Sequence, residues 1–373
     1  MGNRANRSTE LAIRLLTSQV EEAWKLGASA SLLQLDIKGY FDSISHARLI
    51  DTVERLGLPS WLLSWLESYL QDRTTTLYFD GAHSPYIGVQ EGVPPGSPLS
   101  PILAILFLAP LYRELREAHP GVSVVGFADD TNLLAFGKSA AFNTNQLEAA
   151  WRTCPGWANR NGISFAPDKC ELLHFNRHRK PWKQGVRLDE GLLVTPVTEA
   201  RFLGVWLDRK LRWGTHYKVL RRKLESQSLA LSRIAGKTWG PGLIQARLVY
   251  TQVIRSALAY GASAFHTPTK KGGRPRGVAQ QLGPTENSCL RGVLGAYRAT
   301  PLRSLYIEAG TPPLDLFLNA RRLAFEGRVG EELKRPLNRA ISRLQARYKT
   351  YRANQTRAQQ DFSSLVEWKG EVY

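Results

Sequence analysis

Before Trp213 the chain combines short apolar runs with segments that have apolar residues at helical spacing, whereas after Trp213 the helical spacing predominates. Two apolar runs flank Ala128-Asp129-Asp130-Thr131 within Val122–Phe136. This pattern is typical of a β-hairpin with a tight turn. Ser31–Ile37 is a second apolar strand and carries Asp36 near its C-terminal end. The pattern predicts a sheet that carries acidic side chains at its strand ends.

Apolar residues at helical spacing predict helices around these strands. They are expected at Glu10–Lys25, His46–Gly57, Trp61–Leu70, Leu99–Ala118 and Asn143–Asn161. Other segments predict a hairpin of Thr74–Phe79 with Ser84–Val89, a turn and strand at Asn161–Phe175, and a single short strand at Arg201–Asp208. From Trp213 onward the pattern is that of cation-rich helices. An α+β region is therefore expected to precede a helical one.

Asp36, Asp129 and Asp130 are candidates for a metal site. Adjacent carboxylates repel and raise each other's pKa unless a cation lies between them. Oxygen-only ligands in a shallow cluster suit Mg²⁺ or Mn²⁺, and two such ions about 3.5–4 Å apart can activate a hydroxyl and stabilise a leaving pyrophosphate. The alternatives are a solvated acidic turn and an aspartate that merely ends a strand.

Two further features could serve the same chemistry. Gln90–Pro101 is a loop rich in glycine and proline, in which Gly96 would let a chain or base approach where a Cβ would clash. Lys169 comes just before a predicted strand, where its ammonium could meet a triphosphate or donate a proton to pyrophosphate. A purely structural loop and a solvated lysine are the alternatives.

The chain has 50 Lys and Arg against 32 Asp and Glu, a formal net charge of +18. Such an excess indicates a polyanionic partner, and nucleic acid is the first candidate. A membrane surface is the rival, but the longest apolar run, Ile102–Leu111, is too short to span a bilayer. The later basic helices, with Trp239, Tyr250 and Tyr260, could contact a duplex backbone or form an ordinary solvated face.

The length of the chain and its cysteines indicate how many domains it has and in which kind of compartment it folds. The 373 residues, 43% of them hydrophobic, allow two or three domains with a large core. Cys154, Cys170 and Cys289 form no CxxC pair, which favours a reducing compartment without a zinc knuckle. Cys170 and His174 lack a third convergent ligand, so a zinc site is rejected. The polar first ten residues predict no signal peptide.

Five segments in order carry a resemblance to a known family: LQLDIKGYFDSI, EGVPPGSPLSP, GFADDTNLL, NGISFAPDKCELLHF and FLGVWLD. Together they resemble the successive motifs of a reverse transcriptase from a non-LTR, LINE-like retrotransposon. The similarity covers residues 2–235. The later segment EAGTPPLDLFLNARR is similar to the connector that precedes an RNase H domain in such elements, notably fungal ones, which implies a fungal origin.

The resemblance implies an α+β fold: a polymerase palm, built as an antiparallel sheet backed by helices, then a helical thumb and a helical C-terminal connector. It assigns residues 1–30 to a remnant of the fingers and their following helix, 31–210 to the palm, 211–266 to the thumb, 267–286 to a basic linker, and 287–373 to the connector and tail. The upstream fingers strands would be missing, with no endonuclease before the palm and no RNase H domain after the connector.

The resemblance also implies site residues. Asp36, Asp129 and Asp130 would hold two Mg²⁺ or Mn²⁺ ions, with Lys169 near the leaving pyrophosphate. The substrate-binding positions would be Ile37, Lys38, Phe41, Pro95, Gly96 and Ser97, with Phe41 as the gate that excludes a 2′-hydroxyl. Phe202, Leu203 and Gly204 would support the primer's 3′ end.

The implied reaction is attack of a DNA primer 3′-OH on the α-phosphate of a dNTP, copying an RNA template. A retrotransposon product of this kind is expected in the nucleus, without a membrane. Phe127 stands where many members have tyrosine, and Pro95 where glutamine would bind nucleotide or template.

Two hypotheses follow from these residues. The first is an RNA-directed DNA polymerase, or the core of one. The second is an inactive retroelement remnant that only binds nucleic acid through its basic helices. A palm-type cyclase shares the metal chemistry but would not need those helices.

Overall fold

The computed structural model describes residues 7–94, 96–188, 191–234, 239–269, 273–330, 334–335 and 338–346. The chain divides into two compact units. The first unit is formed by residues 1–8, 20–198 and 344–373, and the second by residues 9–19 and 199–343. Helix α1 (Thr9–Lys25) therefore contributes its beginning to the second unit and its end to the first.

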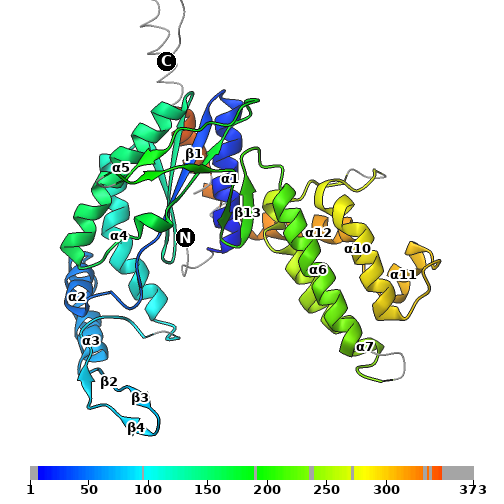
Figure 1. The fold of residues 1–373 in the computed structure, drawn as a ribbon, viewed down its shortest axis with the longest axis horizontal. Helices are drawn as coiled ribbons and strands as arrows, with labels where there is room; N and C mark the ends of the chain where they lie inside the picture. Colours follow the sequence, from blue (N-terminus) through cyan, green and yellow to red (C-terminus); the bar gives the residue numbers. More distant parts are fainter. Residues whose placement is uncertain are drawn as a thin grey trace, which may run out of the picture. The chain divides into compact units, whose positions relative to one another are not determined.

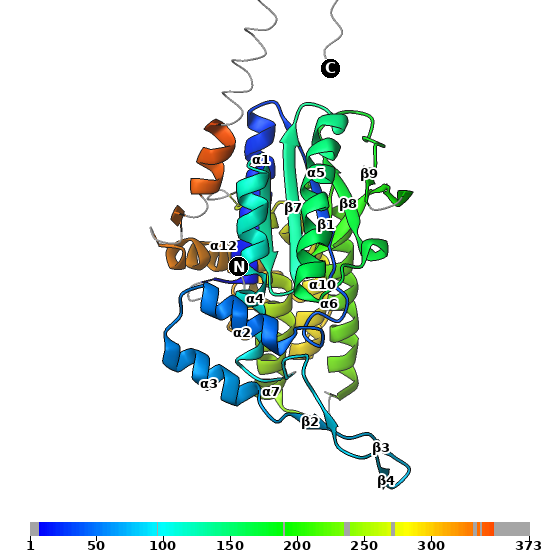
Figure 2. The same ribbon diagram turned by 90° about the vertical axis from the view of Figure 1, so that its left-hand side faces the viewer.

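A five-stranded sheet forms the centre of the first unit, with strand order β11-β8-β1-β7-β6. Figure 2 labels its three middle strands, β8, β1 and β7. Strand β1 pairs antiparallel with β7 and β8, and β6 pairs antiparallel with β7. The strands are β1 (Ser29–Leu35), β6 (Val122–Phe127), β7 (Asp130–Gly137), β8 (Glu171–Phe175) and β11 (Pro196–Val197).

The expected antiparallel sheet is found in four of these strands, whereas the edge strand β11 runs parallel to β8. The chain between these two strands forms a separate pair, β9 (Val186–Arg187) with β10 (Leu193–Val194). After this separate pair, the chain enters the five-stranded sheet again at β11, in the same direction as β8.

Helices α4 (Ser100–Ala118) and α5 (Ala140–Asn161) cover one face of the sheet (Figure 2). Because successive side chains of a strand point to opposite faces, alternate apolar residues of β1 and β7 meet these helices. Leu33, Leu133, Phe107 and Trp151 are buried in the shared core. Both predicted helices are confirmed. The hydroxyl of Ser139, at the start of α5, accepts a hydrogen bond from the Phe142 backbone N–H at 3.2 Å.

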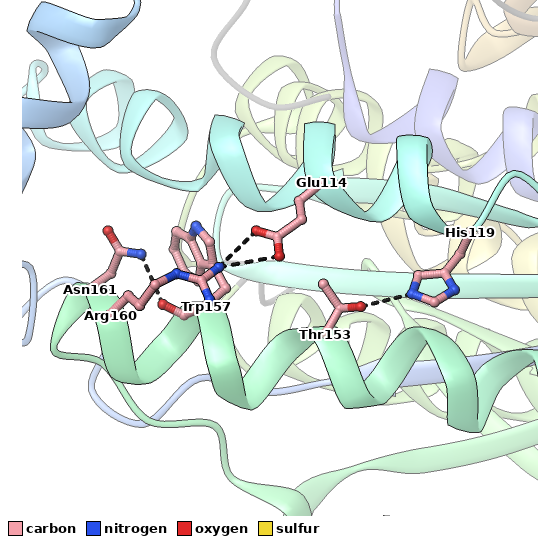
Figure 3. A network of polar contacts seen from close by, with 6 residues as sticks. All are labelled: Glu114, His119, Thr153, Trp157, Arg160 and Asn161. Atoms are coloured by element: carbon pink, nitrogen blue, oxygen red, sulfur yellow. Dashed lines mark hydrogen bonds and ion pairs between the residues drawn. The ribbon is translucent and has the colours of Figure 1, made fainter.

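Polar side chains also connect α4 to α5 (Figure 3). The Glu114 carboxylate accepts hydrogen bonds from Arg160 at 3.0 and 3.2 Å, and His119 Nε2 lies 2.8 Å from the Thr153 hydroxyl. Glu114 and Arg160 are partly exposed, and exposed ion pairs contribute at most about 1 kcal/mol. The apolar contacts therefore hold the two helices together, and the polar contacts fix their register.

Two helices and a long hairpin follow β1 in the first unit (Figure 1). Helix α2 (His46–Arg55) packs against α4 and against α3 (Ser60–Leu70). The predicted hairpin is confirmed as two short ladders, and its turn residues Asp80 and Gly81 have φ of +46° and +81°. Its strands are β2 (Thr74–Thr75), β3 (Tyr78–Phe79), β4 (Ala82–His83) and β5 (Ile87–Gly88).

Helices dominate the second unit. A hairpin precedes α6 (Gly214–Ile234), which packs against α10 (Gly277–Leu294). The remaining elements are α7 (Leu243–Val249), a π-helical turn (Tyr250–Ile254), α8 (Arg255–Ala259), α9 (Ala262–Phe265), α11 (Leu302–Glu308) and α12 (Leu314–Arg328). No helix in the described part of either unit is long and apolar enough to cross a membrane.

Two sequence-based expectations in this unit need correction. Arg201–Asp208 is not one strand but the hairpin β12 (Glu199–Phe202) and β13 (Val205–Asp208), because the chain reverses between them. The linker expected at 267–286 is helical from Gly277, because Val278, Leu282 and other apolar residues at helical spacing are buried there. Residues 270–272 of that segment lie outside the described residues.

The two units differ in charge. Counted along the sequence, the second unit has 27 Lys and Arg against 10 Asp and Glu, a formal charge of +17. The first unit has 23 against 22, a formal charge of +1. Nearly all of the excess positive charge therefore belongs to the helical unit.

Candidate active site

A two-residue turn presents the paired aspartates. Phe127 of β6 pairs with Asp130 of β7, which leaves Ala128 and Asp129 as the turn. Ala128 has φ of +51°, a left-handed conformation that residues with a Cβ adopt rarely. Asp129 and Asp130 are both exposed to solvent. The predicted hairpin is confirmed, and it lifts both carboxylates to the end of the sheet.

The register of the sheet brings Asp36 to the same end. Leu35 of β1 pairs with Thr131 of β7, so the next residue along β1, Asp36, follows opposite Asp130. Opposed residues of antiparallel strands have Cα atoms about 4.5–5.5 Å apart. The charge of Asp36 contributes to raising the pKa of Asp130, so the two carboxylates are close enough to interact.

Lys169 lies beside the first of these acids. Its Nζ is 3.2 Å from Asp36 Oδ2, and both side chains are substantially exposed. It belongs to the 3₁₀ turn Pro167–Lys169, which is held against the end of β1 by a hydrogen bond from the Ala166 N–H to the Asp36 carbonyl oxygen at 2.8 Å. Lys169 therefore lies beside the acidic site, and its expected contact with the leaving pyrophosphate stays a prediction.

The structure does not gather the acids into a finished metal site. In the described ranges, no group of three or more His, Cys, Asp or Glu side chains could hold a metal ion. Partial burial and the charges of Asp129 and Asp36 raise the pKa of Asp130. A divalent cation would relieve this repulsion, so the donor chemistry fits Mg²⁺ or Mn²⁺ once the side chains turn toward one another.

The segment after Asp36 is fixed by its neighbours on both sides. Ile37 is buried and bridges to Phe165, and the Lys38 N–H donates to the Ser164 carbonyl oxygen at 2.9 Å while its side chain is exposed. The Phe41 carbonyl oxygen accepts from the Val93 N–H at 2.8 Å. The half-buried Phe41 ring packs against the core and lies 5.6 Å from the Tyr40 ring.

That hydrogen bond brings the glycine-rich loop beside Phe41. Gly96 is exposed with φ of +87°, so any Cβ there would be strained even though the space around it is open. The Ser97 hydroxyl lies 3.0 Å from the Tyr69 hydroxyl and accepts from the Leu99 N–H at 3.3 Å. Pro95 lies outside the described residues. The loop therefore adjoins Phe41, with Ser97 engaged at the start of α4.

The residues expected at the primer belong to the second unit, whereas the three aspartates belong to the first. Phe202 is buried, and Leu203 and Gly204 form the turn between β12 and β13 with φ of +45° and +85°. The Leu203 carbonyl oxygen accepts from the Tyr260 hydroxyl at 2.8 Å. The Phe202 ring is thus closed to a ligand, whereas Leu203 is partly exposed and Gly204 is exposed.

Sequence reasoning missed the support beneath the aspartates. The Tyr112 hydroxyl, from α4, lies 3.0 Å from the Thr131 hydroxyl. Thr131 pairs with Gly126 across the hairpin, and a Cβ on Gly126 would overlap the Tyr112 ring. Burial raises the pKa of Tyr112 to about 12, with a smaller contribution from the charges of Asp129 and Asp130. The glycine within the apolar run VSVVGF was the available signal, because such a glycine often marks a close approach.

Three aspartates thus lie at one end of a sheet that is covered by helices. A sequence model described as "Reverse transcriptase (RNA-dependent DNA polymerase)" matches residues 1–207. The chain belongs to this reverse transcriptase family. The expected family is thereby confirmed from a comparison that spans more than half of the chain.

Curated relatives are polymerases of mobile elements. The chain is 26% identical over 273 residues to the probable RNA-directed DNA polymerase from transposon BS of Drosophila melanogaster, covering 72% of this chain and 30% of that protein. It is 27% identical over 239 residues to the RNA-directed DNA polymerase from mobile element jockey of the same species, covering 63% and 26%. The chain thus spans less than a third of these relatives' length.

Solved structures of telomerase are also similar. Telomerase from Candida albicans, in complex with a fragment of telomeric RNA, matches 82% of this chain and 55% of that chain with a TM-score of 0.44 and 13% identity. Apo telomerase from Candida tropicalis matches 91% and 57% with a TM-score of 0.41 and 12% identity.

Proposed function

We propose that this chain is the polymerase core of a non-LTR retrotransposon, an RNA-directed DNA polymerase. The single observation that carries the proposal is the register that sets Asp36 opposite Asp130, the sequence neighbour of Asp129, in a member of the reverse transcriptase family. We assign the palm to residues 31–210, the thumb to 211–266 and the connector to the helices after residue 286. The basic charge of the second unit supports its contact with a nucleic-acid backbone.

Asp36, Asp129 and Asp130 are the proposed ligands of two Mg²⁺ or Mn²⁺ ions. When bound, such ions neutralise the phosphates and favour attack by the primer 3′-OH on the α-phosphate of a dNTP. Lys169 would donate a proton to the leaving pyrophosphate, and its ion pair with Asp36 at 3.2 Å supports this role. The departing group then leaves as a less charged species.

The nucleotide and the nucleic acid would occupy the surfaces around these acids. Phe41 is the proposed gate under the deoxyribose, because packing against the core and the bond to Val93 hold it in place. Ile37, Lys38, Pro95, Gly96 and Ser97 are assigned to the nucleotide and template side. The turn at Phe202, Leu203 and Gly204 is assigned to the primer end, which it would contact through its backbone.

Primer extension on an RNA template tests the proposal. Asp129→Ala should reduce extension to background, because one proposed metal ligand is lost. The matched control is Asp51→Ala, which removes an exposed aspartate of α2 that pairs with Arg55 at 3.0 Å. The control should extend primers at the wild-type rate.

The rival function is binding of nucleic acid without catalysis. The ungathered carboxylates favour it, since the described residues contain no finished metal site. Equal background extension by wild type, Asp129→Ala and Asp51→Ala, with retained salt-dependent RNA binding, would establish this rival and overturn the polymerase proposal.

A further inference from the structure

The second unit contains a cavity of about 670 Å³ that the proposed catalytic residues do not line. Its walls come from α10, α11, the start of α12 and the loop that joins the last two. This volume falls within the range typical of small-ligand sites. The cavity is therefore large enough for a flat, ring-sized group.

Most of the cavity wall is apolar. Ala279 of α10, Leu302 and Ile307 of α11 and Leu314 of α12 contribute aliphatic surface, and Tyr306 adds an aromatic ring. The Tyr306 hydroxyl lies 2.8 Å from Oε2 of the buried Glu286 and 2.6 Å from Asn287 Oδ1. Tyr306 is thus held in place by hydrogen bonds, and flat rings stack well on such a support.

A few polar groups lie among these apolar walls. Thr311 lines the cavity, is 8% exposed, and its hydroxyl has no hydrogen-bond partner in the described part of the chain. Asn287 also lines the cavity, and its side-chain carbonyl oxygen lies 2.6 Å from the Tyr306 hydroxyl. A buried hydroxyl without a partner costs about 1–3 kcal/mol, which a ligand with a hydrogen-bonding edge would recover.

Charged residues also belong to this region. Arg303 and Asp315 line the cavity, and the exposed Arg274 and Arg276 flank the lining residue Pro275 in the sequence, so cations outnumber the one carboxylate. The whole unit carries a formal charge of +17. An apolar slot with hydrogen-bonding groups inside and arginines outside matches an unstacked base attached to a phosphate backbone.

We propose that this cavity binds an unpaired nucleobase of a single-stranded nucleic acid, with the adjoining phosphates on Arg274, Arg276 and Arg303. The inference takes from the proposed function only that the partner is a nucleic acid. It does not require that the chain be catalytically active. It gives the second unit a preference for unpaired strands, which backbone contacts by themselves would not provide.

A matched pair of glycines in α10 permits a clean test. Gly283 lines the cavity and Gly292 does not, and a Cβ would meet nothing within 4 Å at either position. Gly283→Leu therefore fills the cavity, and Gly292→Leu makes the same change outside it. Gly283 precedes Pro284, but Ala109 and Cys154 hold the same position before prolines inside α4 and α5, so a side chain there is compatible with a helix.

Binding of the full chain is measured by fluorescence anisotropy with a short mixed-sequence single-stranded RNA, the same sequence as DNA, and its duplex. Gly283→Leu should weaken binding to single strands about tenfold, the effect of losing one stacked base. It should leave the duplex affinity and the salt dependence unchanged, because no phosphate contact is lost. Gly292→Leu should bind like the wild type. The RNA and DNA arms show which strand supplies the base.

Wild-type affinity of Gly283→Leu for both single strands would overturn the proposal, as would an equal loss for single strands and duplex. Such results would indicate that the cavity binds a protein side chain instead of a nucleobase. Thr311→Val, which keeps the shape and removes the hydroxyl, covers the case in which Gly283→Leu does not fold; it should weaken single-strand binding about threefold through one lost hydrogen bond. Because primer extension is not read, failure here and failure of the polymerase proposal are separate results.

Discussion

Each unit contains a carboxylate paired with a cation, and the two pairs are opposite in setting. Lys169 and Asp36 in the first unit lie 3.2 Å apart, with 65% and 41% of their side chains exposed. Arg255 and Glu286 in the second unit lie 3.5 Å apart, with 2% and 0% exposed. An exposed pair is weak and can exchange partners, whereas a buried pair cannot be broken without a large cost. The first is therefore suited to chemistry and the second to structure.

The surroundings of the pairs follow the same division. Glu286 also accepts hydrogen bonds from Tyr250 and Tyr306, and the Arg255 guanidinium lies 4.4 Å from the centre of the Phe317 ring and donates to the Pro312 carbonyl oxygen at 2.7 Å. Asp36 instead adjoins two further carboxylates in a unit of almost neutral charge. The Glu286 carboxylate is thus enclosed by its partners, whereas the carboxylate of Asp36 remains accessible to solvent beside its ion pair with Lys169.

The largest expected effect is on the buried pair. Glu286→Gln leaves the Arg255 charge without a carboxylate in the core, which should lower the free energy of unfolding by about 3–5 kcal/mol. Denaturant unfolding followed by circular dichroism measures this loss. The matched control is Glu225→Gln, which breaks the exposed pair with Arg221 at 3.0 Å and should change stability by less than about 1 kcal/mol. Similar unfolding midpoints for the two variants would contradict the structural role of the buried Arg255–Glu286 pair.

The next effect concerns the support under the aspartates. Gly126→Ala places a Cβ against the Tyr112 ring and should destabilise the chain by about 1–3 kcal/mol, with a parallel loss of primer extension. Gly88→Ala is the control, because Gly88 also lies in a strand but a Cβ there meets nothing within 4 Å. If Gly126→Ala and Gly88→Ala unfold and extend primers alike, Tyr112 does not hold the hairpin in place.

The sequence predicted this hairpin because local pattern decides it. Two apolar runs around an acidic turn form a hairpin in almost any context, and the helices that cover the sheet have their own apolar spacing. The contact of Tyr112 with Gly126 joins a helix to a strand, so no local pattern reveals it. The same holds for Arg255 and Glu286, whose side chains meet only after α8 and α10 pack.

The errors have equally local causes. RFLGVWLD is a continuous apolar run, and a reversal at Leu203 and Gly204 requires two residues at positive φ, of which only the glycine signals it. The basic residues, glycines and prolines before α10 masked the helical spacing of Val278 and Leu282. At Arg201–Asp208 the turn signal was too weak to reveal the hairpin. At 267–286 the composition suggested a linker more strongly than the helix that begins at Gly277 justifies.

Substitution of Lys169 should change stability little but slow primer extension strongly. Lys169→Gln breaks an exposed pair, so the free energy of unfolding should change by less than about 1 kcal/mol. If Lys169 donates the proton to pyrophosphate, the rate of primer extension should fall about 100-fold at saturating dNTP. Lys25→Gln, which breaks the exposed pair with Glu22 at 3.1 Å, should leave the rate unchanged. An unchanged rate in Lys169→Gln would remove Lys169 from the mechanism.

The smallest expected effect is a gain in stability at Asp130. Partial burial and the neighbouring charges of Asp129 and Asp36 raise its pKa above the ordinary 3.8, so the ionised group destabilises the folded state at neutral pH. Asp130→Asn should therefore unfold at a higher temperature than the wild type at pH 7, by no more than about 0.5 kcal/mol in free energy. The gain should fade as the pH falls through the folded pKa and disappear below the unfolded value, since the wild-type carboxyl is then protonated in both states. Asp51→Asn should show no gain at pH 7, because its carboxylate is paired with Arg55. If Asp130→Asn is less stable than the wild type at pH 7, the negative charge at the end of the sheet is already compensated and has no need of a cation.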